Sequence, residues 1–89
     1  MDIAYYGNDL NSGVDNMQYD LDSCRLSCKS VEGSEFYDWV SQDYHDQRYH
    51  YTCWCKSSDS GRGHSVGVIS GNVNCVKATG KLIKSNCGL

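Results

Sequence analysis

Apolar positions recur with the period of an α-helix in residues 20–31. One face of this segment carries four apolar side chains, Leu21, Cys24, Cys28 and Val31. Asp20 is suited to cap the first turn, and Gly33 follows the expected end of the helix. A helix of about eleven residues is marginal in water by itself. We therefore expect its apolar face to dock on another element.

Two further segments have the composition and alternation of β-strands. Residues 36–40 are rich in aromatic side chains, and residues 49–56 alternate. Polar residues 41–48 are expected to form the hairpin loop between them. Alternation would place Tyr49, Tyr51, Cys53 and Cys55 on one strand face, and His50, Thr52, Trp54 and Lys56 on the other.

The C-terminal half continues with turns and short strands. Residues 57–63 predict a turn, and residues 66–69 and 72–75 predict two strands separated by Ser70 and Gly71. The order is a strand, a helix and then several strands. It predicts one α+β domain over residues 1–89, with a single helix packed on a small antiparallel sheet.

The composition indicates that this fold needs covalent support. The chain has 89 residues, and its 39% hydrophobic content includes seven tyrosines and six cysteines. Few large aliphatic side chains remain, and small domains with modest cores usually need disulfides, a metal or a partner. The even number of cysteines favours disulfides.

Cysteine spacing suggests how the bridges are arranged. Cys24 and Cys28 share a helix face, and Cys53 and Cys55 share a strand face. Two parallel bridges would clamp helix to strand, each closing a loop of about 30 residues and contributing roughly 3–4 kcal/mol. The remaining residues, Cys75 and Cys87, are expected to pair with each other.

Disulfides predict maturation in an oxidising compartment, so we expect a secreted, cell-surface or secretory-lumen protein. The C-x3-C and C-x-C spacings differ from the knuckles of structural zinc sites, and no metal or other cofactor is expected.

Charge is unevenly distributed along the chain. Residues 1–46 hold ten acidic and two basic side chains, whereas residues 47–89 hold six basic and one acidic, and the net charge is −3. The halves are expected to attract each other or to steer a charged partner. The overall sign argues against nucleic acid as a partner. No apolar run approaches the roughly 18 residues of a membrane span, so membrane insertion is not expected.

Five segments, taken in order, resemble the PAN/Apple domain, and the resemblance covers residues 3–75. They are Tyr-Gly-Asn-Asp-Leu at 6–10, the C-x3-C segment at 22–28, Phe-Tyr-Asp-Trp at 36–39, Cys-Trp-Cys-Lys-Ser-Ser at 53–58 and Val-Ile-Ser-Gly at 68–71. The first of these is similar to the opening strand of the family.

The cysteine pattern departs from the family at one position. The family usually has a cysteine just before its aromatic strand, where this chain has Gly-Ser-Glu at 33–35. Cys55 is the natural substitute, so the resemblance implies the pairs Cys24–Cys53 and Cys28–Cys55. The nested alternative, Cys24–Cys55 with Cys28–Cys53, stays open.

The resemblance implies an extracellular adhesion module without catalytic activity. Such domains occur in microneme adhesins of apicomplexan parasites, in clotting zymogens and in growth-factor precursors, and they bind proteins or carbohydrates. The motifs here look closest to the parasite adhesins, some of which are galactose-type lectins. The expected partner is a cell-surface glycan or a protein receptor, and the domain can be one unit of a multidomain protein.

A ligand surface is expected on the strand face that points away from the helix. His50, Trp54 and Lys56 would form a platform there, and Tyr44 and Tyr49 would add contacts from the hairpin loop. The alternative is that Trp54 packs under a neighbouring loop or in a second small core, and loop tyrosines suit a protein partner equally well.

After glycan binding and protein recognition, the third hypothesis is catalysis by a small secreted hydrolase or ribonuclease. His50 with Glu35 would supply an acid–base pair. No serine lies in a recognisable nucleophile motif, so we expect a non-enzymatic domain.

Overall fold

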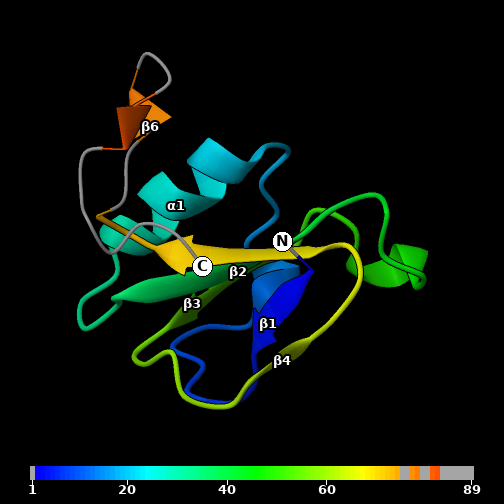
Figure 1. Ribbon diagram of the computed structural model, residues 1–89, viewed down its shortest axis with the longest axis horizontal. Helices are drawn as coiled ribbons and strands as arrows, with labels where there is room; N and C mark the ends of the chain where they lie inside the picture. The colour runs from blue at the N-terminus through cyan, green and yellow to red at the C-terminus, as the bar shows by residue number, and fades with distance from the viewer. Residues whose placement is uncertain (1, 75–76, 79–80, 83–89) are drawn as a thin grey trace.

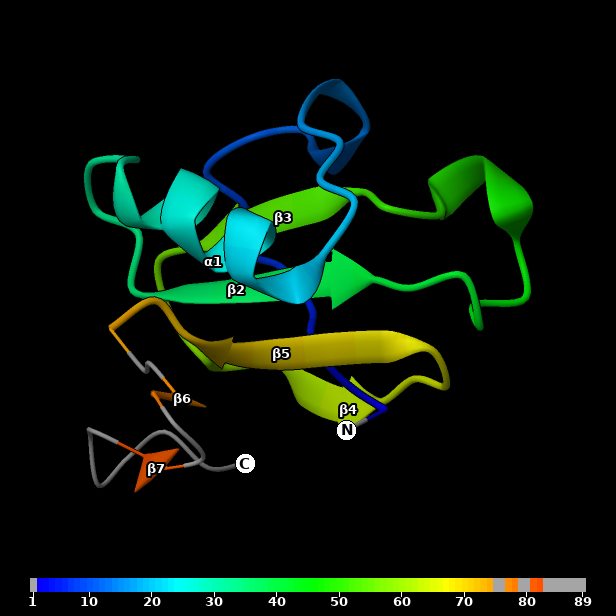
Figure 2. The ribbon, with the colours of Figure 1, turned by 90° about the horizontal axis from the view of Figure 1, so that it is seen from above.

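The computed structural model describes residues 2–74, 77–78 and 81–82. One helix packs on a three-stranded antiparallel sheet with the strand order β3-β2-β5 (Figures 1 and 2). These elements are α1 (Leu21–Lys29), β2 (Phe36–Val40), β3 (Cys53–Lys56) and β5 (Val68–Asn72). The order of elements and the α+β class agree with the prediction.

Smaller elements complete the described fold. A two-stranded ribbon joins β1 (Ile3–Tyr5) to β4 (Arg62–His64), and a second joins β6 (Lys77–Ala78) to β7 (Lys81–Leu82). Two 3-10 turns, η1 (Gly13–Asp15) and η2 (Gln47–Tyr49), lie in the connections. The helix among the described residues is too short to cross a membrane.

Helix α1 begins and ends as its sequence signals predict. The Asp20 side chain accepts a hydrogen bond from the Ser23 amide at 2.8 Å, which caps the first turn. The helix ends at Lys29, two residues before the predicted limit, where the Ser30 amide donates to Ser27. Gly33 follows with a φ of +83°, a conformation that glycine adopts without strain.

The apolar face of α1 forms the main core with one face of the sheet. Cys24 and Cys28 of the helix are fully buried there. The surrounding side chains are Tyr37, Cys53, Cys55 and Val73, with Leu21, Val31 and Trp39 at the edge. The expected docking of the helical stripe is thus confirmed.

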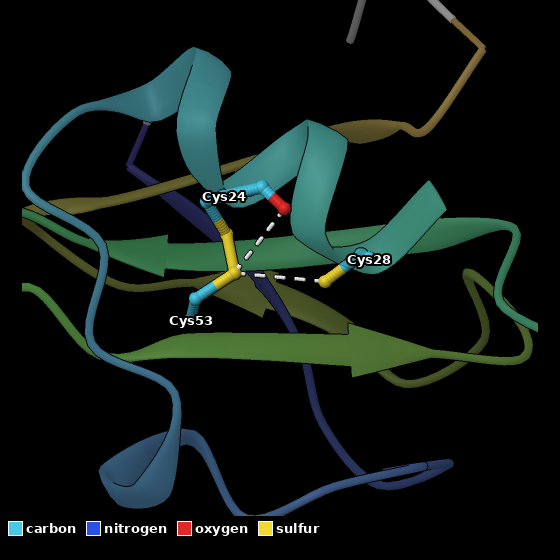
Figure 3. A group of neighbouring side chains, drawn as sticks. All are labelled: Cys24, Cys28 and Cys53. Carbon is cyan, nitrogen blue, oxygen red and sulfur yellow. Dashed lines mark hydrogen bonds between the residues drawn. A yellow bond between two sulfur atoms is a disulfide. The ribbon is translucent and has the colours of Figure 1, made fainter. Parts of the chain in front are cut away.

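Two disulfides join α1 to β3. Cys24 bonds Cys53 and Cys28 bonds Cys55, with Cα–Cα distances of 5.5 and 5.1 Å. This is the pairing that the family resemblance implies, rather than the nested alternative. Figure 3 shows the Cys24–Cys53 bridge with Cys28 beside it. The expected bond between Cys75 and Cys87 lies outside the described residues.

Three strand predictions need correction. The strand predicted at 49–56 begins only at Cys53, because η2 precedes it and Tyr51 has a φ of +69°. The two strands predicted around Ser70 and Gly71 are one continuous strand, β5. The opening strand is β1, and the segment at 6–10 that resembles the family's first strand contributes only an isolated bridge, between Asp9 and Lys56.

Packing explains why a glycine stands at position 71 within β5. A Cβ at this position would lie 2.8 Å from the Tyr37 hydroxyl, so only glycine leaves room for that ring. Its pairing with Tyr37 in the sheet is otherwise regular. The glycine that suggested a turn in the sequence therefore reflects the close approach of the Tyr37 ring to the backbone of β5.

The second face of the sheet is partly covered, in contrast to the free surface that we expected. The ribbon of β1 and β4 lies on the side opposite α1 (Figure 1). Ala4, Val40 and Val68 form a small buried cluster beneath it, and Tyr44 and Trp54 pack against this cluster. Burial of these apolar side chains provides the physical reason for the covering.

Candidate functional site

The uncovered part of that second face is a pocket of about 250 Å³. Its wall is formed by the back of β2 and β3, by the chain that follows β1, and by the loop between β2 and β3. The lining residues that carry the argument below are Tyr5, Tyr6, Asp9, Asp38, Tyr44, Tyr49, Trp54 and Lys56.

Lys56 places a buried ammonium group at this pocket. Its side chain is only 5% exposed, although its position on β3 turns it away from the helix as predicted. The Nζ atom donates to the Gly7 carbonyl at 3.0 Å and to Asp9 Oδ1. It also lies 3.9 Å from Asp38 Oδ2. Lys56 is therefore bound by internal acceptors and is not the exposed cation that we expected.

Asp38 is the second buried charged group, and it connects β1 to the sheet. Its carboxylate accepts hydrogen bonds from the Tyr5 amide, at 2.9 Å to Oδ2, and from the Ser70 hydroxyl. Burial raises the pKa of this carboxyl from 3.8 to about 6, although both hydrogen bonds and Lys56 act in the opposite direction. Asp38 thus titrates closer to neutral pH than a solvated aspartate does.

Aromatic rings form the walls of the pocket. The Trp54 indole donates to the Thr52 hydroxyl at 3.0 Å, and it lies so close to Gly13 that a Cβ there would be 2.2 Å from the ring. Tyr44 and Tyr49 stand edge to face, with ring centroids 6.5 Å apart. The walls of the pocket are therefore formed partly by tightly packed rings and partly by exposed ring surfaces.

Tyr5 adds a hydroxyl group without a partner. The side chain is fully buried and its ring packs edge-on against Phe36 at 5.5 Å. Its hydroxyl has no hydrogen-bond partner among residues 2–74. Burial raises the pKa of this phenol, so it stays a neutral donor at neutral pH.

Three of the four predicted ligand-binding residues meet at the pocket: Tyr44, Trp54 and Lys56. The fourth, His50, does not line it. Because the strand begins later than predicted, His50 lies beyond η2, and its Nε2 atom contacts the Tyr44 carbonyl at 2.7 Å. The alternative for Trp54, packing in a second small core, is confirmed, and the same residue lines the pocket.

The sequence reasoning missed Tyr5, Asp9 and Asp38. For Asp38 a signal was available, because antiparallel pairing places it opposite Trp54, on the same face. Tyr5 and Asp9 gave no such signal, since they reach the pocket only through long-range docking of the N-terminal segment.

The proposed acid–base pair of His50 and Glu35 is not assembled. The Glu35 amide donates to the Lys56 carbonyl at one end of β3, whereas His50 precedes the other end. A strand rises about 3.3 Å per residue, so the hairpin holds the two side chains well apart.

Three sulfur atoms, those of Cys24, Cys28 and Cys53, lie within 4.8 Å of one another (Figure 3). Such a cluster resembles a metal site in its spacing. All three are engaged in disulfides, however, and a metal ligand must be a thiolate.

Comparison of the chain with models of known protein families, with curated proteins and with solved structures finds no match. The interpretation of the pocket therefore depends on its geometry and chemistry.

Proposed function

We propose that this chain is an extracellular recognition module of PAN/Apple type that binds a saccharide in the pocket and catalyses no reaction. The observation that carries the proposal is the combination of aromatic walls with polar groups at one site. Small-molecule sites are typically apolar surfaces with a few well-placed polar groups. The disulfides support residence in an oxidising compartment.

The size of the pocket limits the ligand. A volume of about 250 Å³ is below the range of roughly 300–1,000 Å³ that is typical of sites for drug-sized ligands. A single sugar ring, such as the end of a glycan chain, suits this volume. The C–H face of the ring would pack on Tyr44, Tyr49 or Trp54, and its hydroxyls would reach Asp9. Galactose-type sugars are the first candidates because of the family resemblance.

A glycan array followed by calorimetry on the oxidised domain tests this proposal. Tyr49→Ala removes a pocket ring that is 37% exposed, and we expect about a tenfold loss of affinity, equivalent to about 1.4 kcal/mol. Tyr19→Ala is the matched control, since Tyr19 is 71% exposed and does not line the pocket. An array without any signal, or equal losses in both variants, would contradict the proposal.

Recognition of a protein is the second candidate function. Residues 10–26 expose five large apolar side chains, namely Leu10, Val14, Met17, Tyr19 and Leu26. Exposed apolar and aromatic groups are common in protein interfaces. The same segment carries Asp15, Asp20 and Asp22, so a basic partner surface would be favoured. Partner capture that is lost in Tyr19→Ala and kept in Tyr49→Ala would favour this function over saccharide binding.

A further inference from the structure

We infer that Asp9 makes the pocket selective for cationic and neutral sugars over anionic ones, with a free amino sugar as the preferred class. This inference rests on the proposed saccharide site. Some hydrogen-bonding groups of the pocket are already paired within the protein, and others remain available to a ligand. The inference follows from this difference.

Lys56 is largely satisfied within the protein. Its ammonium group donates two of its three protons, to the Gly7 carbonyl and to Asp9, and the Asp38 carboxylate lies 3.9 Å away as a second ion-pair partner. The side chain is also 5% exposed. Lys56 is thus poorly placed to bind a carboxylate or sulfate on a ligand.

Asp9 has acceptor capacity to spare. Its side chain is 41% exposed, and Lys56 is its only side-chain partner within residues 2–74. A carboxylate has about four lone-pair positions, so several stay open to a ligand. Asp38, in contrast, is 8% exposed and is bound by Tyr5 and Ser70. Asp9 is therefore the accessible charge of the pocket.

The other lining groups do not offset this charge. The lining includes no arginine or histidine among the described residues. The Trp54 indole N–H is bonded to Thr52, and the Tyr5 hydroxyl is neutral. Two carboxylates therefore face one ammonium group. An anionic ligand would meet uncompensated negative charge, whereas a ligand ammonium would gain a charge-assisted hydrogen bond to Asp9.

Aromatic walls strengthen the same preference. Cations are attracted to the faces of tyrosine and tryptophan rings, by about 0.5–1 kcal/mol at exposed sites. Tyr6, which is 58% exposed, offers such a face at the pocket, whereas the Arg48 guanidinium already lies 5.8 Å from the centroid of the Tyr49 ring. A sugar ammonium would thus be favoured by both the ring and the charge.

A matched series of sugars tests the inference. Four sugars share one ring: galactosamine is cationic, N-acetylgalactosamine and galactose are neutral, and galacturonic acid is anionic. They are titrated into the oxidised domain at pH 7, with the Trp54 indole resonance followed by NMR. We expect galactosamine to bind at least about fivefold more tightly than galactose, and galacturonic acid to bind more weakly. Added salt should reduce this spread because it screens the exposed charge.

Asp9→Asn is the decisive variant. It removes the accessible charge but keeps a side-chain oxygen that can accept from Lys56, so the preference for galactosamine over galacturonic acid should fall at least about tenfold. Asp15→Asn makes the same charge change outside the pocket and should keep the wild-type order of affinities. Amide spectra of both variants establish that they are folded.

The outcomes separate the inference from the proposed function. If the sugars bind but galacturonic acid equals galactosamine, or if both variants behave alike, the inference is wrong and the saccharide site survives. If none of the four sugars moves the Trp54 resonance, the saccharide site itself is wrong, and the inference fails with it.

Discussion

The Lys56 ammonium lies 3.9 Å from Oδ2 of Asp38, and both side chains are almost fully buried between the sheet and β1. Asp38 also holds the Tyr5 amide, so this pair connects the N-terminal strand to the sheet. The stability of the pocket therefore depends on charged groups that solvent scarcely reaches.

Replacing Lys56 with methionine should destabilise the protein. The change keeps the aliphatic stem but leaves the buried Asp38 without its cation. Because the pKa of Asp38 is already about 6, its carboxyl takes up a proton instead of staying charged, and the cost at pH 7 is on the order of 1–2 kcal/mol. Urea unfolding at pH 7 measures the loss. Adding Asp38→Asn to Lys56→Met should recover part of it, because the amide is neutral without taking up a proton. Equal stability of the single and double variants would show that the pair is not coupled.

Asp38 should also make stability depend on pH. Because its folded pKa is raised from 3.8 to about 6, the folded state holds this proton more tightly than the unfolded state. Its contribution is complete below pH 3.8 and is lost as pH rises through 6, on the order of 2–3 kcal/mol. Comparing urea midpoints of wild type and Asp38→Asn from pH 4 to 7 isolates this contribution. A difference that is constant over that range would contradict it.

Asp46 affects stability in a separate range of pH. Hydrogen bonds from Arg48 lower the pKa of its carboxyl to about 2, so its contribution is present above pH 3.8 and is lost only as pH falls through 2. It does not overlap the range assigned to Asp38.

Either disulfide by itself would contribute about 3–4 kcal/mol, since both close loops of similar length. The sequence separations are 29 for Cys24–Cys53 and 27 for Cys28–Cys55. With one bridge left in place the other closes only a short additional loop, so removing either pair by alanine substitution should lower stability by about 2–3 kcal/mol, measured by urea unfolding. Peptide mapping without reduction should recover the two cross-linked peptides, and the nested pairing would contradict the structure.

Gly13→Ala tests the packing of η1 on Trp54. The added Cβ would lie 2.2 Å from the indole, so the ring or the turn must move, at a cost of about 1–3 kcal/mol. We expect a lower melting temperature and a shifted Trp54 indole resonance. Ser12→Ala, at the exposed position before it, should leave both unchanged.

The sequence alone determined the features that depend on neighbours in the chain. The stripe of α1, its Asp20 cap, the strand at 36–40 and the outward face of Trp54 and Lys56 all follow from local periodicity. Cysteines at helix and strand spacing also indicated which two elements are joined.

Tertiary structure decided the features that depend on distant residues. Docking of β1 on the sheet buried Lys56 between Asp9 and Asp38. These two residues are 47 and 18 positions away from Lys56 in the sequence. The same docking turned the exposed platform that we expected into a pocket. Gly71 lies within a strand paired with β2, and position 71 is glycine because Tyr37 occupies the space above it. Periodicity describes which way a side chain points from its own element, but it contains no information about what packs there. The covering segment therefore determined both the burial and the charge of the candidate site.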